Sequence, residues 1–257
     1  MVEVKSLAGK KGLAKATETK AATGRAEAKR CSARKNRERV LSGIPGFDEL
    51  LYGGIPRDNL VVLSGDPGSG KTCFALQYLY YGATKCLEKG VYISLEETED
   101  EVIGIASEFG WDYRKLVKEN KLRIITLELY DFDKLKNIIE DVVSEIGAKR
   151  IVIDPGVVFK LFFEKELDAR KKILSLGRLL KKIGVTAMIT NEINLDRTAS
   201  LFGLEEYVAD GVILLYHTKI KGRFVRSAAI LKMRGTRISD SLHPIKISSR
   251  GIEVIPK

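Results

Sequence analysis

Residues 60–72 read LVVLSGDPGSGKT, and this stretch decides the fold of the chain. Its first five residues form a short apolar run that is typical of a strand buried in a sheet. The remaining eight fit the pattern G-x-x-x-x-G-K-[ST] at every position, and the residues CFAL that follow are typical of a buried helix. A strand, a glycine-rich turn and a helix in this order are the setting that the pattern requires.

This loop predicts a nucleotide-binding site. Glycines let the backbone wrap around phosphate oxygens, and the helix N-terminus adds partial positive charge. We expect Lys71 to reach the β- and γ-phosphates of ATP and the Thr72 hydroxyl to ligate Mg²⁺. The alternative, a turn that binds nothing, is disfavoured by the complete match in this setting. The residues predicted to bind ATP are Gly65, Asp66, Pro67, Gly68, Ser69, Gly70, Lys71, Thr72 and Cys73.

The chain from residue 40 onward alternates between apolar runs and longer stretches with helical spacing. The apolar runs predict buried strands at 60–64, 91–95, 122–127, 150–154 and 185–190. The helical spacing predicts helices at 72–87, 99–109, 134–146 and 167–183. Thr98 and Glu101 predict a capping box at the start of the second helix. Strands separated by helices imply a parallel sheet covered on both faces, so the predicted fold class is α/β.

The C-terminal part is expected to differ, because no helical spacing follows residue 210. Four apolar runs, at 212–216, 225–233, 245–248 and 252–255, are separated by short turns. Such spacing is typical of antiparallel strands. We therefore expect a mainly parallel sheet that finishes with antiparallel strands.

Acidic or amide side chains end three of the predicted strands. In an open α/β sheet, ligands bind beyond the carboxyl ends of the strands, on the side of the phosphate loop. Asp154 ends an apolar strand, and a carboxylate there can hold Mg²⁺ through water. The alternative is an aspartate that caps the turn before Pro155. Asn191, after another strand, could touch the γ-phosphate or form a structural hydrogen bond.

Glu96 and Glu97 end the second strand of the set. Adjacent carboxylates repel each other, which can raise the pKa of one of them into the range of a general base. We expect at least one of the two to orient and deprotonate the attacking water. The alternative is that one or both simply begin the loop that leads to Thr98.

The charge of the chain is unevenly placed. The formal charge is +10, and residues 1–40 hold seven Lys and five Arg against four Glu. Residues 1–38 contain hardly any large apolar side chains, so burial cannot offset their ordering entropy. We expect a disordered basic arm over 1–38, either a solubilising tail or a nucleic-acid-binding arm, followed by one ATPase domain over 39–257. No apolar run approaches ~18 residues, which predicts a cytoplasmic protein without a membrane span.

Four segments carry a family resemblance. Residues 41–56 read LSGIPGFDELLYGGIP and lead into the phosphate loop. Together with YISLEE at 92–97, EEYVADGVI at 205–213 and KMRGT at 232–236, they resemble the KaiC-like branch of the RecA superfamily, in its single-domain archaeal or bacterial type. The resemblance implies a RecA-like core, hydrolysis of ATP, and assembly into homo-oligomeric rings, commonly hexamers.

The resemblance also implies roles for particular residues. The paired glutamates of the family serve the hydrolytic water, which maps onto Glu96 and Glu97. The K-x-R-G-T element reaches the γ-phosphate of ATP bound to the neighbouring subunit, which maps onto Lys232 and Arg234. A cation supplied in this way stabilises charge on the transferring phosphoryl group and makes hydrolysis depend on assembly. Without the resemblance, the same residues would be interpreted as an exposed basic hairpin.

The use of the ATP stays open between several classes. One is a DNA-associated ATPase. Proteins of the RecA superfamily bind DNA with the loops after the fourth and fifth strands, which here are residues 155–168 and 193–207. Both loops contain few basic residues. The hairpin at 217–226 is richer in cations, with Lys219, Lys221 and Arg223, although a solvated turn is the alternative. The other classes are a regulatory ring that binds protein partners and a structural ring with negligible turnover. Neither His217 nor His243 is assigned a role.

Overall fold

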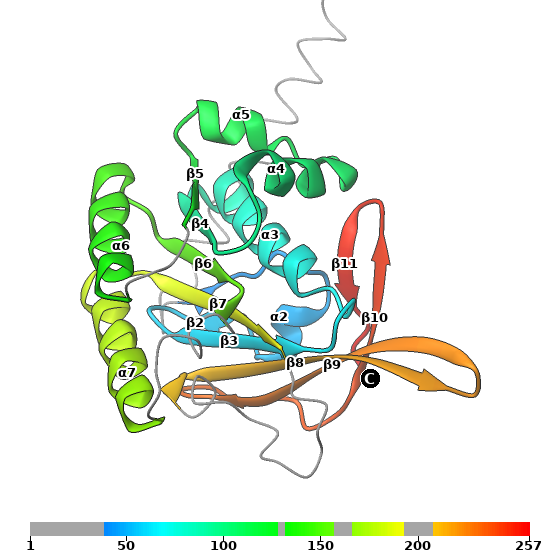
Figure 1. Ribbon diagram of the computed structural model, residues 1–257. Coiled ribbons are helices and arrows are strands. Elements are labelled where there is room, and N and C mark those ends of the chain that lie inside the picture. Colours follow the sequence, from blue (N-terminus) through cyan, green and yellow to red (C-terminus); the bar gives the residue numbers. More distant parts are fainter. Residues whose placement is uncertain (1–38, 128–131, 157–165, 193–207) are drawn as a thin grey trace, which may run out of the picture.

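The computed structural model describes residues 39–127, 132–156, 166–192 and 208–257 (Figure 1). The predicted basic arm lies outside these ranges, as do most of the two loops considered for DNA contact. One sheet of nine strands dominates, and a two-stranded sheet precedes it. The strands of the large sheet are β3 (Leu60–Gly65), β4 (Gly90–Ser94), β5 (Leu122–Thr126), β6 (Arg150–Asp154), β7 (Thr186–Glu192), β8 (Gly211–Ile220), β9 (Arg223–Met233), β10 (His243–Ser248) and β11 (Gly251–Val254).

The order of the large sheet is β11-β10-β9-β8-β3-β7-β6-β4-β5. The strands from β8 to β5 in this order pair in parallel, and β9, β10 and β11 pair antiparallel. This confirms the predicted α/β class and the antiparallel finish. The parallel strands all end at one edge, here called the carboxyl edge, and begin at the opposite amino edge. Strand β3, which leads into the phosphate loop, lies at the centre.

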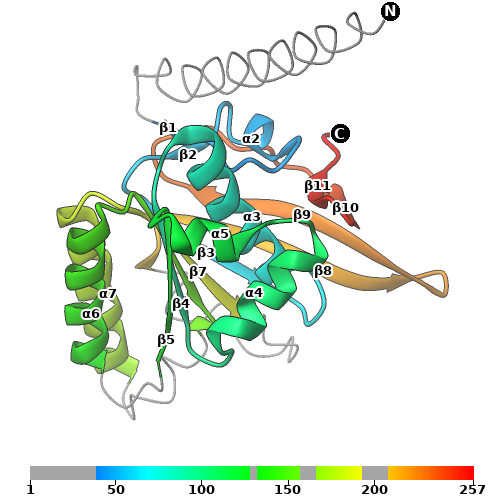
Figure 2. The ribbon, with the colours of Figure 1, turned by 90° about the horizontal axis from the view of Figure 1, so that it is seen from above.

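Helices cover both faces of the large sheet, as Figures 1 and 2 show. Val61 and Leu63 of β3 point to one core and Leu60 and Val62 to the other, as alternation along a strand requires. The core on the side of Val61 and Leu63 includes residues of α3 (Lys71–Tyr81), α4 (Glu99–Glu108) and α5 (Tyr113–Lys118), and is called the first core. The second core, on the side of Leu60 and Val62, includes residues of α6 (Phe132–Ile146) and α7 (Glu166–Lys182).

None of the helices in the described ranges is long and apolar enough to cross a membrane.

Most predicted elements are present, with shifted ends. The helix predicted over 72–87 is α3 followed by a π-helical turn, η1 (Gly82–Cys86). The capping box is confirmed, since Thr98 accepts from the Glu101 N–H and Glu101 accepts from the Thr98 N–H. Sequence reasoning missed α5, and it also missed β1 (Arg39–Val40), α2 (Phe47–Leu50) and β2 (Ile55–Pro56). Each of these elements has six residues or fewer, which is too short for helical spacing or strand alternation to repeat.

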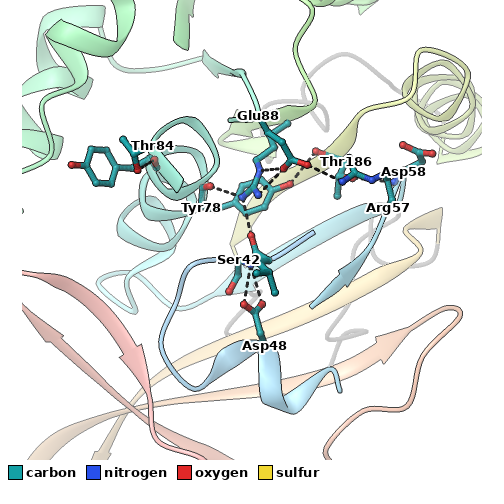
Figure 3. A network of polar contacts seen from close by, with 11 residues as sticks. Ser42, Asp48, Arg57, Asp58, Tyr78, Thr84, Glu88 and Thr186 are labelled. Carbon is teal, nitrogen blue, oxygen red and sulfur yellow. Dashed lines mark hydrogen bonds and ion pairs between the residues drawn. The ribbon is translucent and has the colours of Figure 1, made fainter. Parts of the chain in front are cut away.

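A fully buried arginine ties the amino edge together. Arg150, the first residue of β6, forms an ion pair with Glu88 at 2.7 Å and lies over the ring of Tyr78 at 4.6 Å. It also donates to the backbone carbonyls of Leu41 and Tyr78. Figure 3 shows Glu88 between this network and Arg57, which donates to its other carboxylate oxygen at 2.8 Å. One guanidinium thus joins β6, α3 and the segment before α2.

We expect Glu88→Ala to lower the free energy of unfolding by about 3–5 kcal/mol, because it leaves the Arg150 charge buried without its carboxylate. Thermal or urea unfolding measures this change. Glu145→Ala is the matched control: it removes an exposed ion pair with Arg123 and should cost less than about 1 kcal/mol. Equal losses in the two variants would show that the buried network adds no more stability than an exposed ion pair.

Candidate functional site

The phosphate loop joins β3 to α3 at the carboxyl edge. Gly68 and Gly70 have φ of 71° and 104°, a region that favours glycine. At Gly65 a Cβ atom would meet the Leu215 carbonyl oxygen at 2.5 Å and the Ser69 hydroxyl at 2.6 Å, so no larger residue fits. The glycines of the pattern are therefore required by backbone conformation and by close packing against β8.

Lys71 lies at the first position of α3 and bends back over the loop. Its ammonium donates to the carbonyls of Gly65 at 3.0 Å and Asp66 at 3.2 Å. Partial burial lowers the pKa of Lys71, and the carboxylates of Glu192, Asp154 and Asp66 act in the opposite direction. The cation is therefore held within a cluster of carboxylates and carbonyl oxygens at the mouth of the loop.

Asp154 accepts hydrogen bonds from three hydroxyl groups at the carboxyl edge. Its carboxylate accepts from Thr72 at 3.1 Å, from Tyr92 at 2.6 Å and from Thr190. The side chain is buried, and burial together with the Asp154 charge raises the pKa of Tyr92, so that this phenol stays a donor. Residues of α3, β4 and β7 thus converge on the last residue of β6. The carboxylate contacts the first turn of α3 through Thr72, and its role in binding Mg²⁺ stays a prediction.

Glu96 and Glu97 occupy different environments. The Glu96 side chain is exposed, whereas Glu97 is half-buried and its backbone N–H donates to the Ser94 hydroxyl at 2.8 Å. Burial raises the pKa of Glu97, and the carboxylates of Asp154, Glu96 and Glu101 raise it further. The sequence left the two glutamates equivalent; the structure singles out Glu97 as the one beside Asp154.

Lys232 and Arg234 lie at the amino edge, away from the phosphate loop of their own chain. Strand β9 runs antiparallel, so its last residue pairs with Gly211, the first residue of β8. Arg234 follows β9 and contacts Asp210 at 3.3 Å. It lines a concave pocket with other charged side chains, namely Arg39, Arg57, Asp58, Lys181 and Asp210. The structure therefore does not bring this element to the other predicted site residues.

The β8–β9 hairpin extends past the phosphate loop and contacts it. The Arg226 side chain donates to the Gly68 carbonyl at 2.9 Å. The backbone N–H of His217 donates to the Asp66 carboxylate at 2.8 Å, and its ring lies 3.4 Å from the Pro67 carbonyl oxygen. Sequence reasoning did not predict the contact of either residue with the phosphate loop, because these contacts join positions about 150 residues apart.

The tip of this hairpin projects from the body of the molecule, as both ribbon views show (Figures 1 and 2). Lys221 and Gly222 form the turn with φ of 47° and 80°, values that suit a tight two-residue hairpin. Phe224 is 66% exposed, and its ring lies against that of His217 with centroids 5.0 Å apart and the ring planes tilted by 44°. Lys219, Lys221 and Arg223 are also exposed, so the tip combines an aromatic ring with cations.

Cys73 lies just inside α3 with its side chain in the first core. Burial raises the pKa of this thiol to about 12, so it stays protonated at neutral pH. The Cys73 side chain therefore packs in the core and does not act as a thiolate. A contact of Cys73 with nucleotide, if made through its backbone N–H, stays a prediction.

Comparisons with known proteins agree with this geometry. Residues 40–257 match the family model described as ATPase: KaiC. UPF0273 protein MJ1359 of Methanocaldococcus jannaschii is 37% identical over 236 residues, covering 85% of this chain and 97% of the relative. A UPF0273 protein of Thermotoga maritima is 35% identical over 238 residues, covering 85% and 96%.

A solved structure supports the same assignment. The crystal structure of the KaiC-like protein PH0186 from Pyrococcus horikoshii OT3 matches with a TM-score of 0.77 and 40% identity. The match covers 85% of this chain and 99% of that one. The family model, the curated relatives and the solved neighbour agree with the phosphate loop and the RecA-like sheet, so this chain belongs to the KaiC family of ATPases.

Proposed function

We propose that the protein is a Mg²⁺-dependent ATP hydrolase whose turnover depends on homo-oligomeric assembly. The observation that carries this proposal is the contact of Thr72 with Asp154 beside Lys71 at the mouth of the phosphate loop. A hydroxyl and a carboxylate are hard oxygen donors that suit Mg²⁺, which usually binds through one or two protein ligands and the phosphates of the substrate. Both donors already face the loop.

Each residue of the site has a distinct task in this proposal. Backbone N–H groups of the loop and the Lys71 ammonium bind the phosphates, and Glu97 takes the proton of the attacking water. Its raised pKa makes it a better base than an exposed glutamate at neutral pH. Thr72 and Asp154 would hold Mg²⁺, which would neutralise charge on the β- and γ-phosphates when bound.

Lys232 and Arg234 complete the site from a neighbouring subunit. Their position supports this role, because β9 ends at the amino edge, opposite the phosphate loop of the same chain, and 62% of the Arg234 side chain is exposed there. A head-to-tail contact of carboxyl edge to amino edge is heterologous and closes into a ring when the rotation allows it. We favour a hexamer, in line with the family resemblance.

Lys71→Ala should weaken ATP binding by about a hundredfold, since loss of charge-assisted contacts to two phosphates removes roughly 3 kcal/mol. Equilibrium binding of a fluorescent ATP analogue with Mg²⁺ measures it, and hydrolysis should stop when EDTA removes the metal. Lys115→Ala, which removes an exposed lysine of α5, is the control and should leave affinity unchanged. Unchanged affinity in Lys71→Ala would refute the assignment of the loop.

Glu97→Gln should lower kcat by about 10²–10⁴-fold, the usual contribution of a general base. A base works when deprotonated, so kcat of the parent should fall as pH drops through a Glu97 pKa above the ordinary value of 4.5. This acid limb should be absent from Glu97→Gln and present in the control Glu96→Gln, whose side chain is exposed. If Glu96→Gln lost the acid limb instead, the roles of the two glutamates would be reversed.

A second candidate function is association with DNA. It is favoured by the hairpin tip, where Lys219, Lys221 and Arg223 surround the exposed ring of Phe224. Cations that contact phosphates and aromatic rings that stack on bases are the usual elements of single-strand binding. The competing class is a regulatory ring that binds protein partners, with slow turnover and no role for DNA.

Steady-state ATP hydrolysis with and without single- and double-stranded DNA separates the two classes. If DNA binds, we expect stimulation at low salt that weakens at moderate salt, because released counterions drive such binding. Lys219→Ala/Lys221→Ala/Arg223→Ala should reduce the stimulation and leave the basal rate unchanged. A rate indifferent to DNA in the parent protein at both salt concentrations would favour the regulatory class.

A further inference from the structure

Arg234, at the amino edge, is held by hydrogen bonds to both its backbone and its side chain. The Arg234 N–H donates to the Asp210 carbonyl at 2.8 Å, and Asn59 donates to the Arg234 carbonyl at 3.3 Å. The guanidinium donates to the Asp210 carboxylate at 3.3 Å. Yet 62% of the Arg234 side chain is exposed, so the group is oriented while most of it stays accessible.

The partner that holds Arg234 is itself fixed. The Asp210 side chain is 6% exposed, and one carboxylate oxygen accepts from Arg234 and from Lys181, the latter at 2.8 Å. The other oxygen accepts from the Leu60 N–H at 3.1 Å. A buried carboxylate keeps its charge when it is paired and hydrogen-bonded, and these donors meet that condition.

Leu60 is the first residue of β3, the strand whose last residue is Gly65 of the phosphate loop. At the amino edge, the Asp210 side chain therefore contacts both Arg234 and the first residue of β3. The other end of β3 leads into the phosphate loop of the same chain. No other carboxylate in the described ranges is an ion-pair partner of Arg234.

We infer that Asp210 is the positioning residue for Arg234, so that the arginine reaches the nucleotide of the neighbouring subunit in one orientation. This inference rests on the proposed function, in which Arg234 acts on that nucleotide. A long, exposed arginine samples many rotamers, and a transition-state contact benefits when orientation is fixed before the reaction. The Asp210 carboxylate fixes the orientation of the Arg234 guanidinium. Because the same carboxylate accepts from the Leu60 N–H, the guanidinium is also held in place relative to β3, the strand that leads into the phosphate loop.

Asp210→Asn tests the idea because it keeps an oxygen for Leu60 and removes the charge that holds Arg234. We expect kcat to fall by about tenfold, less than the 10³–10⁵ attributed to a complete arginine finger. The affinity for ATP should stay within about twofold of that of the parent, and the oligomeric state should be unchanged, because Asp210 acts through Arg234. Asp58→Asn is the matched control: it removes the same charge from the same pocket and should leave kcat unchanged.

A mixing experiment distinguishes positioning in trans from a structural role in the same subunit. Asp210→Asn subunits are mixed one to one with Glu96→Gln/Glu97→Gln subunits, which keep Arg234 and Asp210 but lack the base. Intact arginines from the second variant should then serve the sites of the first. The rate should rise to about a quarter of the parent rate, as random mixing with one required neighbour gives. A mixed rate no higher than the sum of the two separate rates would overturn the inference.

Arg234→Ala in the same mixing protocol separates this inference from the proposed function. Rescue of Arg234→Ala without rescue of Asp210→Asn would leave the trans arginine intact and reject Asp210 as its positioning residue. Failure of both would reject the trans arginine and the inference with it. If Asp210→Asn melts early, Asp210→Asn/Lys181→Met keeps the local net charge and should show the same rescue.

Discussion

The buried carboxylate of Asp154 is the point on which the candidate site depends. Hydroxyl groups from α3, β4 and β7 donate to it, so one side chain holds the helix after the phosphate loop against two strands of the sheet. Parallel strands make this possible, because their last residues all arrive at one edge. Gly70 precedes α3 with φ of 104°, and this backbone conformation lets the helix begin at Lys71, which brings Thr72 next to the Asp154 carboxylate.

The same strand carries a second buried charge at its other end. Arg150 begins β6 and Asp154 ends it, and each is surrounded by partners of its own. The two edges of the sheet have separate tasks: the carboxyl edge gathers the phosphate loop and its acids, while the amino edge holds the Arg150 network and Arg234. This separation suits an assembly in which each subunit offers a different edge to each of its neighbours.

The fold was predictable where the pattern is local. The phosphate loop, the strands around it and the capping box depend on residues close in the sequence, and Asp154 could be placed from the rule that strands end at one edge. The difference between Glu96 and Glu97 could not, because it arises from burial next to Asp154. The contacts of Arg226 and His217 with the loop depend on how far β8 and β9 extend, which apolar runs do not specify.

The two-residue turn of the β8–β9 hairpin has a consequence for protein engineering. The turn is exposed at the tip, while the His217–Arg226 pair, further along the same hairpin, contacts Asp66, Pro67 and Gly68. A foreign domain inserted between Lys221 and Gly222 would stand clear of the core and remain attached to the loop by two strands. A change of shape in that inserted domain would pull on the nucleotide site, so the hairpin is the place at which to build a biosensor.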